Sequence, residues 1–461
     1  MIFSEAQSYL LSLGQETLTI KLGLTNTERL LDALNNPHKS FPSVQIAGTN
    51  GKGSTAVMLE SICRAARIRV GLFTSPHLVS ITERIRIEGK EISELDFARL
   101  TAQVKQAADE LVKRGRLATL PTFFEHVTAI ALLAFCEAKV ELAILETGLG
   151  GRLDSTTAAE AQIVAITPVA MDHEDYLGHT LAEIASEKAA IIRRGVTAVV
   201  APQQEDASDV VLQRCREVGV TPRIVRQMDE FHPLPTESSS APGCRFSLTS
   251  SSRDGSGCAS FETPEQRFLN VCLGLQGWHQ VMNAAIAIAL AEALCERGFA
   301  ISHQAIVSGL ENARHPGRLE LWEGAPSILF DGAHNPAAAR ALREYLDEFV
   351  HQPVTMIFGA MRDKALVEME AILFPAARAV VLAEMDNPRA ATIGDLRAAV
   401  PRDFDRTRLH EAKSVTDALR VARQISNADS LILVTGSLYL VGAAQQQLSE
   451  RSHAAIDAKS H

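Results

Sequence analysis

The chain lacks closely spaced cysteines. Its seven cysteines stand at positions 63, 136, 215, 244, 258, 272 and 295, and no Cys-x-x-Cys motif occurs. Structural zinc sites use paired ligands at short spacing, and the disulfide frameworks of small secreted domains use even sets of cysteines. The sequence therefore predicts free thiols, neither a zinc ribbon nor a disulfide, and a reducing, cytoplasmic location.

A leader segment and long apolar runs are also missing. Residues 1–7 contain no basic stretch followed by a hydrophobic segment, so we expect no signal peptide. The longest apolar stretches, such as residues 127–136, are too short to cross a bilayer. The sequence therefore predicts a protein without a membrane partner.

Basic residues are outnumbered. The chain has 45 Lys and Arg residues against 55 Asp and Glu residues, a formal net charge of −10. Neutralising the backbone of a nucleic acid requires a basic face, so this balance argues against nucleic acid as the main partner. A local basic pocket for a small anionic ligand remains compatible with it.

The 461 residues are too many for one ordinary domain. Short apolar runs at 44–47, 70–73, 142–146 and 163–167 alternate with helical patterns, which is typical of a parallel sheet with helices on both faces. A Ser-, Pro- and Gly-rich stretch at 234–267 predicts a small antiparallel patch with an exposed loop at 250–258. The alternation restarts after residues 315–318.

The expected architecture is therefore α/β with two domains. Residues 1–314 should form the larger one, a parallel sheet entered through a glycine-rich phosphate loop (P-loop). Residues 315–461 should form a smaller Rossmann-like unit. We expect the final residues, 452–461, to be frayed.

The phosphate loop follows the first predicted strand and opens a helix. Backbone N–H groups of such a loop, the helix N-terminus and a lysine together bind phosphate oxygens. The spacing is unusual, because only two residues separate Gly48 from the Gly-Lys pair, and a glycine replaces the hydroxyl residue that normally follows the lysine. A purely structural glycine turn is the alternative. The residues predicted to bind a nucleotide triphosphate here are Thr49, Asn50, Gly51, Lys52, Gly53 and Ser54.

Side chains suited to Mg²⁺ follow other predicted strands, where ligands gather in parallel sheets. Ser75 could supply the missing hydroxyl, and Glu146 ends a buried strand before a glycine-rich loop. His173 also follows a strand, and Lys188 lies on the next helix. Each of these four residues has a simpler alternative role. Ser75 could form a Ser-Pro turn and Glu146 could cap the glycine-rich loop. His173 could be a structural histidine and Lys188 a solvated lysine.

A fifth motif lies in the second unit, where Asp331, His334, Asn335 and Pro336 crowd a strand-to-helix turn. Proline fits the first turn of a helix, and asparagine is a common helix cap. Capping by Asn335 alone leaves Asp331 and His334 unexplained.

In their number and order, these motifs resemble the folylpolyglutamate synthetase/dihydrofolate synthase family, within the Mur-ligase-like ATP-dependent amide ligases. The similarity runs from residues 21–24 to residues 435–439. Between them lie matching segments at 48–54, 75–77, 122–125, 146–154, 171–173, 187–189, 279–283, 316–318, 331–336 and 359–364.

The resemblance implies a two-domain ligase with ATP in the cleft between its domains. It implies that Lys52, Lys188 and His334 are catalytic, and that Asn283, Arg318 and Asp331 meet the nucleotide. It implies two Mg²⁺ sites, one with Ser75 and Glu146, the other with His173 and a carbamylated Lys188. The residues implied to line the pterin site are Thr122, Phe123, Phe124, Glu125, Leu153, Asp154 and Ser155.

The implied reaction joins L-glutamate to dihydropteroate and to reduced folates through an acyl phosphate, in a monomer. Three departures are visible: Ser-Thr-Thr after Asp154, with Thr157 where the family commonly has Asn; Ala190 where Gly is usual; and a longer loop at 250–258. Folylpolyglutamate synthesis alone, another Mur-type ligase, and a P-loop kinase or regulator are the alternatives. The motifs at 75–77 and 122–125 argue against a cell-wall ligase.

Overall fold

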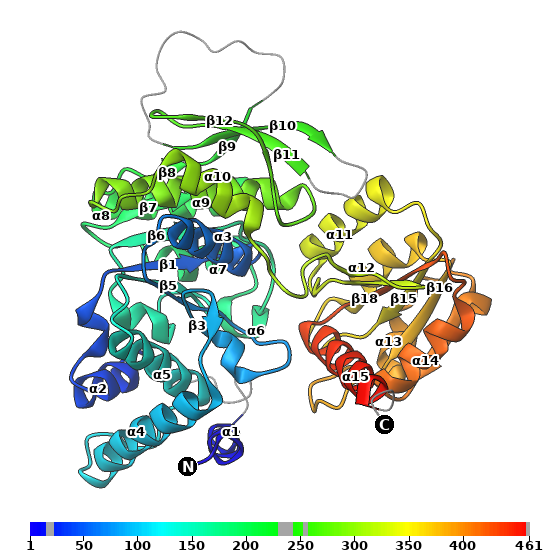
Figure 1. The fold of residues 1–461 in the computed structure, drawn as a ribbon, viewed down its shortest axis with the longest axis horizontal. Helices are drawn as coiled ribbons and strands as arrows, with labels where there is room; N and C mark the ends of the chain where they lie inside the picture. The colour runs from blue at the N-terminus through cyan, green and yellow to red at the C-terminus, as the bar shows by residue number, and fades with distance from the viewer. Residues whose placement is uncertain (15–22, 229–242, 252–256, 458–461) are drawn as a thin grey trace.

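The computed structural model describes residues 1–14, 23–228, 243–251 and 257–457, and it contains two α/β units side by side (Figure 1). A large sheet with its helices forms the N-terminal unit, a small, mainly antiparallel sheet lies beyond one layer of those helices, and a second sheet forms the C-terminal unit. Both expected sheets and the antiparallel patch are therefore confirmed. Within the described residues, no helix is long and apolar enough to cross a membrane.

The N-terminal sheet has eight strands in the order β4-β3-β2-β5-β1-β6-β7-β8. All neighbouring pairs from β2 to β8 are parallel, and β3 and β4 extend the edge as antiparallel strands. Every residue of β1, β2, β5 and β6 is buried, as expected for strands covered on both faces. The bounds are β1 Ser43–Ala47, β2 Val70–Phe73, β3 Ile85–Ile87, β4 Lys90–Glu91, β5 Leu142–Glu146, β6 Ile163–Ile166, β7 Thr197–Val200 and β8 Arg223–Ile224.

Helices cover both faces of this sheet. One face packs against α3 (Lys52–Ala65), α9 (His279–Glu296) and α10 (His303–Asn312), the layer that also carries the small sheet. The opposite face packs against a second set of helices. That set is α1 Phe3–Ser12, α2 Thr25–Ala33, α4 Glu94–Lys113, α5 Phe123–Glu137, α7 Leu181–Ala189 and α8 Glu205–Val218, with the short α6 Glu174–Leu177 beside α7.

The small sheet has the order β12-β11-β10-β9, from β9 Arg226–Gln227, β10 Arg245–Ser251, β11 Gly257–Glu262 and β12 Arg267–Cys272. Residues 250–251 belong to β10 and residues 257–258 to β11, although we expected them in the loop at 250–258, and residues 252–256 lie outside the described part.

One expectation about cysteines is wrong, because Cys258 and Cys272 form a disulfide. They are 14 residues apart in sequence, but the antiparallel register of β11 and β12 places them directly opposite each other, with Cα atoms 4.0 Å apart. The spacing along the chain did not reveal this register. The other five cysteines are free thiols.

The C-terminal sheet has six strands in the order β13-β14-β18-β15-β16-β17, and only β13 is antiparallel. Helices α11, α12 and α13 pack on one face, and α14 and α15 pack on the other. The strands are β13 Glu320–Trp322, β14 Ser327–Phe330, β15 Val354–Phe358, β16 Ala379–Ala383, β17 Leu409–Ala412 and β18 Leu431–Thr435. The helices are α11 Pro336–Phe349, α12 Leu366–Leu373, α13 Ile393–Ala399, α14 Val415–Ile425 and α15 Leu438–Asp457.

The chain end differs from expectation, because α15 continues through residues that we expected to be frayed. It ends at Asp457, and residues 458–461 lie outside the described part.

Candidate active site

A cavity of about 510 Å³ opens between the two units, at the carboxyl ends of β1, β2, β5 and β6 and beside the turns after β14 and β18. Twenty of the sequence-predicted site residues line it. From the N-terminal unit these are Thr49, Asn50, Gly51, Lys52, Gly53, Ser54, Ser75, Thr122, Phe124, Glu125, Glu146, Leu153, Asp154, Ser155, His173, Lys188 and Asn283, and from the C-terminal unit Arg318, Asp331 and His334.

The phosphate loop connects β1 to α3, as the sequence predicts. Gly51 has φ +86°, a left-handed conformation that glycine adopts without strain, and it precedes the first residue of α3. The Nζ of Lys52 donates to the carbonyl oxygens of Gly48 and Thr49, each at 3.1 Å. Burial lowers the pKa of Lys52, and the charge of Glu146 opposes this shift. The loop therefore brings the amine of Lys52 to the N-terminus of a helix, where anions bind.

The glycine after this lysine has a steric reason. A Cβ atom at Gly53 would lie 2.8 Å from His315 Cε1 and 3.3 Å from Glu146 Oε2. The His315 ring itself approaches the loop, with Nδ1 3.2 Å from the Ser54 hydroxyl. A hydroxyl residue at position 53 would displace these neighbours.

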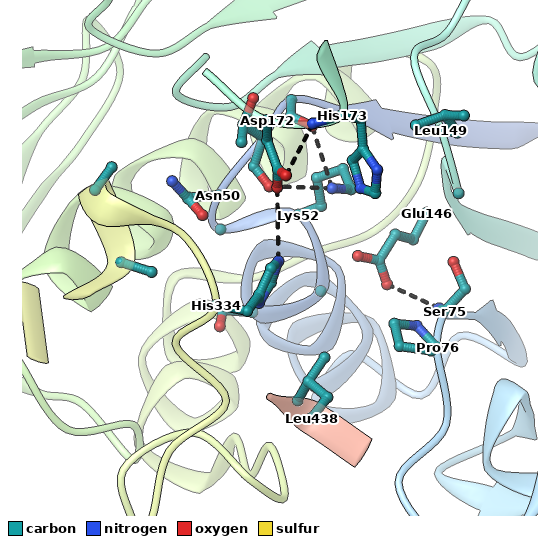
Figure 2. Close-up of a pocket in the computed structure, with 18 of the residues that line it drawn as sticks. Asn50, Lys52, Ser75, Pro76, Glu146, Leu149, Asp172, His173, His334 and Leu438 are labelled. Carbon is teal, nitrogen blue, oxygen red and sulfur yellow. Dashed lines mark hydrogen bonds and ion pairs between the residues drawn. The ribbon is translucent and has the colours of Figure 1, made fainter. Parts of the chain in front are cut away.

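Ser75 and Glu146 lie together at the ends of adjacent strands β2 and β5 (Figure 2). The backbone N–H of Ser75 donates to Glu146 Oε2 at 3.1 Å. Burial raises the pKa of Glu146, and the positive charge of Lys52 counteracts the rise. A buried carboxylate beside a hydroxyl side chain has the oxygen donors that Mg²⁺ prefers.

Lys188 on α7 reaches the phosphate loop from the opposite side and donates from Nζ to Gly48 O at 2.9 Å. Burial, reinforced by the nearby charge of Lys52, lowers the pKa of Lys188 to about 7. Burial also lowers the pKa of His173 to about 3, although Asp172 opposes that shift. At neutral pH His173 is an uncharged imidazole and much of Lys188 is an uncharged amine, the forms that can ligate metal or react with CO₂.

The residues expected at the pterin site include a capping box at the start of α5. Thr122 accepts from the Glu125 N–H at 3.3 Å, and Glu125 accepts from the Thr122 N–H at 2.6 Å. Phe124 lies against the next loop, where a Cβ at Gly148 would be 2.6 Å from its ring. Phe123 differs from expectation: it does not line the cavity, and it packs in the core beneath the guanidinium of Arg84.

Asp154 ties down the glycine-rich loop that follows β5. One carboxylate oxygen accepts from the N–H groups of Gly148 and Leu149, both at 2.9 Å, and the other accepts from the Thr156 N–H at 3.0 Å. Burial raises the pKa of Asp154, while the hydrogen bonds act in the opposite direction. Its contacts are therefore those of a loop anchor at the cavity wall.

The unusual Thr157 lies beneath this loop. Its hydroxyl donates to Gly151 O at 2.7 Å and accepts from Gln45 Nε2, also at 2.7 Å. Thr157 is not among the residues that line the cavity. Thr157 therefore supports the loop from outside the cavity.

Three residues expected to meet the nucleotide face the phosphate loop from the other wall. Asn283 on α9 donates to Gln280 Oε1 at 2.9 Å, and a side chain at Gly51 would collide with it. Asp331 accepts from the N–H groups of Leu319 and Ala333, each at 3.0 Å, and it lies beside the charge of Arg318.

His334 lies in the turn between β14 and α11. Its Nδ1 donates to Gly332 O at 2.8 Å, which leaves Nε2 directed toward the N-terminal unit. Burial lowers the pKa of His334 to about 4, so the ring is uncharged at neutral pH. Asn335 caps α11 by accepting from the Ala338 N–H at 2.9 Å, and its amide also donates to Asn50 Oδ1 at 3.0 Å.

Sequence reasoning assigned no role to several residues at the same cavity. Asp172 lies beside His173 in the matching segment 171–173, and Lys364 ends the matching segment 359–364. Their positions after β6 and β15, at the carboxyl ends of parallel strands, were the available signal. The other lining residues without an assigned role include His279, Gln280, Met361, Arg389, Ser437 and Tyr439.

Among the described residues, no group of three or more His, Cys, Asp and Glu side chains could hold a metal ion. Protein carboxylates supply only one or two ligands to Mg²⁺ at phosphate sites, and substrate oxygens and water supply the others. Isolated donors such as Glu146 and His173 fit that pattern.

Fold and site together define a class, the Mur ligases. The family model described as Mur ligase middle domain matches residues 46–291, and the one described as Mur ligase, glutamate ligase domain matches residues 317–438. The match to the middle domain alone spans more than half of the chain.

Relatives with assigned names narrow the class. A dihydrofolate synthase/folylpolyglutamate synthase of Bacillus subtilis is 33% identical over 94% of this chain and 97% of its own length. A probable bifunctional folylpolyglutamate synthase/dihydropteroate synthase of Halobacterium salinarum is 37% identical over 96% of this chain, which spans only 51% of that protein. The chain belongs to the folylpolyglutamate synthase/dihydrofolate synthase family.

Solved structures agree in fold. Escherichia coli FolC in complex with DHPP and ADP is 30% identical, with a TM-score of 0.83, over 98% of this chain and 99% of that one. A bifunctional folylpolyglutamate synthase/dihydrofolate synthase with Mn, AMPPNP and L-glutamate bound is 29% identical, with a TM-score of 0.80, over 97% and 98%.

Proposed function

We propose that this protein is an ATP-dependent ligase that joins L-glutamate to dihydropteroate and to reduced folates. One observation carries the proposal: a single cavity brings together the phosphate loop, the carboxylate of Glu146, the capping box at Thr122 and the imidazole of His334. The complexes of relatives with ADP and DHPP, and with L-glutamate, support the same three ligand classes.

In the proposed nucleotide site, Lys52 and the N–H groups of residues 49–54 hold the phosphates. Asn283, Arg318 and Asp331 hold the rest of the nucleotide from the opposite wall. The cation at Lys52 offsets negative charge that develops during phosphoryl transfer, which is the main task of a protein in such reactions.

Two Mg²⁺ ions complete the proposed site. Ser75 and Glu146 would hold the first, and the buried carboxylate of Glu146 fits a cation because burial alone penalises its charge. His173 and a carbamylated Lys188 would hold the second. The carbamate forms when the uncharged Nζ of Lys188 bonds to the carbon of CO₂ and releases one proton. Bound Mg²⁺ supplies charge neutralisation and alignment of the phosphates.

The proposed reaction has two steps. The substrate carboxylate attacks the γ-phosphorus of ATP, and ADP leaves, which gives an acyl phosphate. The amine of glutamate then attacks the acyl carbon, phosphate leaves, and the nitrogen loses a proton. We place His334, uncharged at neutral pH, near the acyl phosphate and the incoming amino acid.

On the substrate side, we place the pterin against Thr122, Phe124, Glu125 and the loop at 153–155. Phe123 would act from the core, by supporting the first turn of α5. The carboxylate end of the substrate would then point toward the phosphate loop, since both line one cavity.

We further propose a domain division at 314/315, where the connection from α10 reaches the turn at 315–318 before β13. The enzyme would act in the cytoplasm as a monomer on small molecules, without a nucleic-acid or membrane partner. The net charge of −10 supports the exclusion of nucleic acid.

The test supplies purified enzyme with dihydropteroate, ATP, Mg²⁺ and glutamate, and separately with tetrahydrofolate and the same partners. Dihydrofolate from the first mixture and a tetrahydrofolate with one added glutamate from the second are expected. Product from the second alone would restrict the activity to folylpolyglutamate synthesis. Product from neither mixture would overturn the substrate assignment, and ADP release without any amine acceptor would favour a kinase or regulator.

A further inference from the structure

One buried carboxylate of the N-terminal domain joins three side chains of the C-terminal domain. Asp172 Oδ1 accepts from Lys364 Nζ at 2.5 Å, and Oδ2 accepts from Asn335 Nδ2 at 3.3 Å. His334 Nε2 lies 3.7 Å from the same Oδ2, the contact drawn in Figure 2. These partners follow Asp172 in the chain by more than 160 residues, so the contacts join the two domains.

Lys364 depends on this contact for its charge balance. The Asp172 and Lys364 side chains are only 7% and 8% exposed. In the described part of the chain, a second carboxylate, that of Asp363, lies 3.9 Å from Lys364, and Asp363 is already paired with Arg389 at 2.9 Å. Removing one member of a buried pair leaves an uncompensated charge, which strongly disfavours the closed arrangement.

Asp172 is itself fixed to the phosphate loop. Its Oδ1 accepts from the His173 N–H at 2.9 Å, which holds the carboxylate against its own turn. The hydroxyl of Thr49 donates to Ala170 O and accepts from the Ala170 N–H, both at 3.0 Å. The segment 170–173 therefore moves with the loop that binds phosphate.

We propose that Asp172 is a positioning residue for the ligase reaction: through Lys364 and Asn335 it holds the C-terminal domain, and with it His334, over the phosphate loop. The inference rests on the proposed function. A closed cavity excludes water. Asp172 thus favours attack on the acyl phosphate by the glutamate amine over attack by water, which would return the carboxylic acid and free phosphate.

The test measures coupling, the ratio of ADP released to amide formed, in Asp172→Asn and Lys364→Met. Wild-type enzyme should release about one ADP per amide, as the proposed stoichiometry requires. Each variant should raise the ratio and reduce kcat for amide formation about a hundredfold, the scale expected when reacting groups are misplaced by about 1 Å. The variant carrying both changes should lose little more than either alone, because both remove the same contact.

A matched control removes a second contact between the domains. Trp278 Nε1 donates to Glu348 Oε2 at 2.5 Å, and Glu348 does not line the cavity. Glu348→Gln should keep the ratio at the wild-type value. Thermal unfolding of all variants confirms that they are folded before the ratios are compared.

A second measurement needs no catalysis. Small-angle scattering of the full chain without substrates should give a larger radius of gyration for Asp172→Asn and Lys364→Met than for wild type and Glu348→Gln. This measurement separates failure of the inference from failure of the proposed function. Even if the wild-type protein formed no amide, its radius of gyration would still show whether the domains are closed. Unchanged scattering with wild-type coupling in both variants would overturn the inference, as would strictly additive losses in the double variant.

Discussion

Two lysines donate to one carbonyl oxygen, that of Gly48. Lys52 approaches along its own helix and Lys188 from α7, and the charge of each disfavours that of the other. Nearby Glu146 supports the charged form of Lys52, whereas Lys188 has a pKa of about 7. In the proposed site, Lys52 serves as the cation and Lys188 as the amine that takes up CO₂. The Gly-Lys motif predicted the first, but only the fold brings the second to the same oxygen.

Lys52→Ala should nearly abolish turnover while leaving the fold intact. Loss of one preorganised donor to developing charge costs about 2.7–4 kcal/mol of transition-state stabilisation, which corresponds to about a 10²- to 10³-fold fall in kcat. ADP release with both substrates present measures the change, and thermal unfolding checks the fold. A folded variant with near-normal turnover would contradict the phosphate-loop assignment.

Lys188→Ala should lose activity and recover part of it when acetate or another small carboxylate is added. The added carboxylate would take the place of the carbamate, which a free lysine ammonium could not, because it would repel Mg²⁺. Lys52→Ala serves as the control, because acetate, an anion, cannot replace the missing cation. If acetate restored activity equally in both variants, or in neither, the assignment of a carbamate to Lys188 would be contradicted.

At the scale of elements, strands were predictable and side-chain directions were not. The buried strands β2 and β5 have the expected bounds, because apolar runs ending at polar loops define them in sequence. Phe123 and Phe124 are adjacent on α5. Because successive side chains of a helix point in different directions, Phe123 packs in the core and Phe124 lines the cavity. The contact of Asp172 with Lys364 depends on domain placement, about which local patterns carry no information.

The disulfide of the small sheet gives an element-scale prediction. Thiol titration of the denatured, unreduced protein should find five free cysteines, rather than the seven expected from spacing alone. Cys272→Ser should lower the free energy of unfolding by about 3 kcal/mol, the value for closing a loop of about 15 residues. Cys136→Ser, which leaves the disulfide intact, is the control. Seven titratable thiols in protein purified without reductant would contradict the pairing.

At the scale of the whole molecule, two sheets with separate cores share one site. The clusters around β14–β16 and around β1–β6 are distinct, so each domain can lose structure at its own temperature or pH. The cavity depends on both, because its walls come from both. Conditions that loosen either domain should therefore reduce ligand binding before the chain unfolds completely.

Glu370 on α12 makes the C-terminal domain sensitive to pH. Its side chain is fully buried, neither carboxylate oxygen has a hydrogen-bond partner among the described residues, and burial raises its pKa to about 8. The ordinary value in the unfolded chain is 4.5, so the folded state binds the extra proton between these values. Stability should therefore fall as pH rises from about 4.5 to about 8 and then level off.

Glu370→Gln should flatten this dependence and raise the free energy of unfolding at pH 8 and above relative to wild type. Denaturant unfolding monitored across pH 5–9 measures both effects. Glu368→Gln on the same helix is the control, because its carboxylate is half exposed and paired with Arg340 at the surface. Parallel pH curves for wild type and Glu370→Gln would contradict a buried, protonated Glu370.

The uncharged amine of Lys188 has a consequence for handling the protein. With the proposed carbamate at Lys188, the competent fraction of enzyme would depend on dissolved inorganic carbon as well as on nucleotide and metal. Protein stored in degassed, carbonate-free buffer should begin turnover with a lag, and a trace of bicarbonate should abolish that lag. The reaction itself neither consumes nor produces CO₂. Its rate would nevertheless depend on the CO₂ content of the gas with which the solution is equilibrated, because of one buried nitrogen.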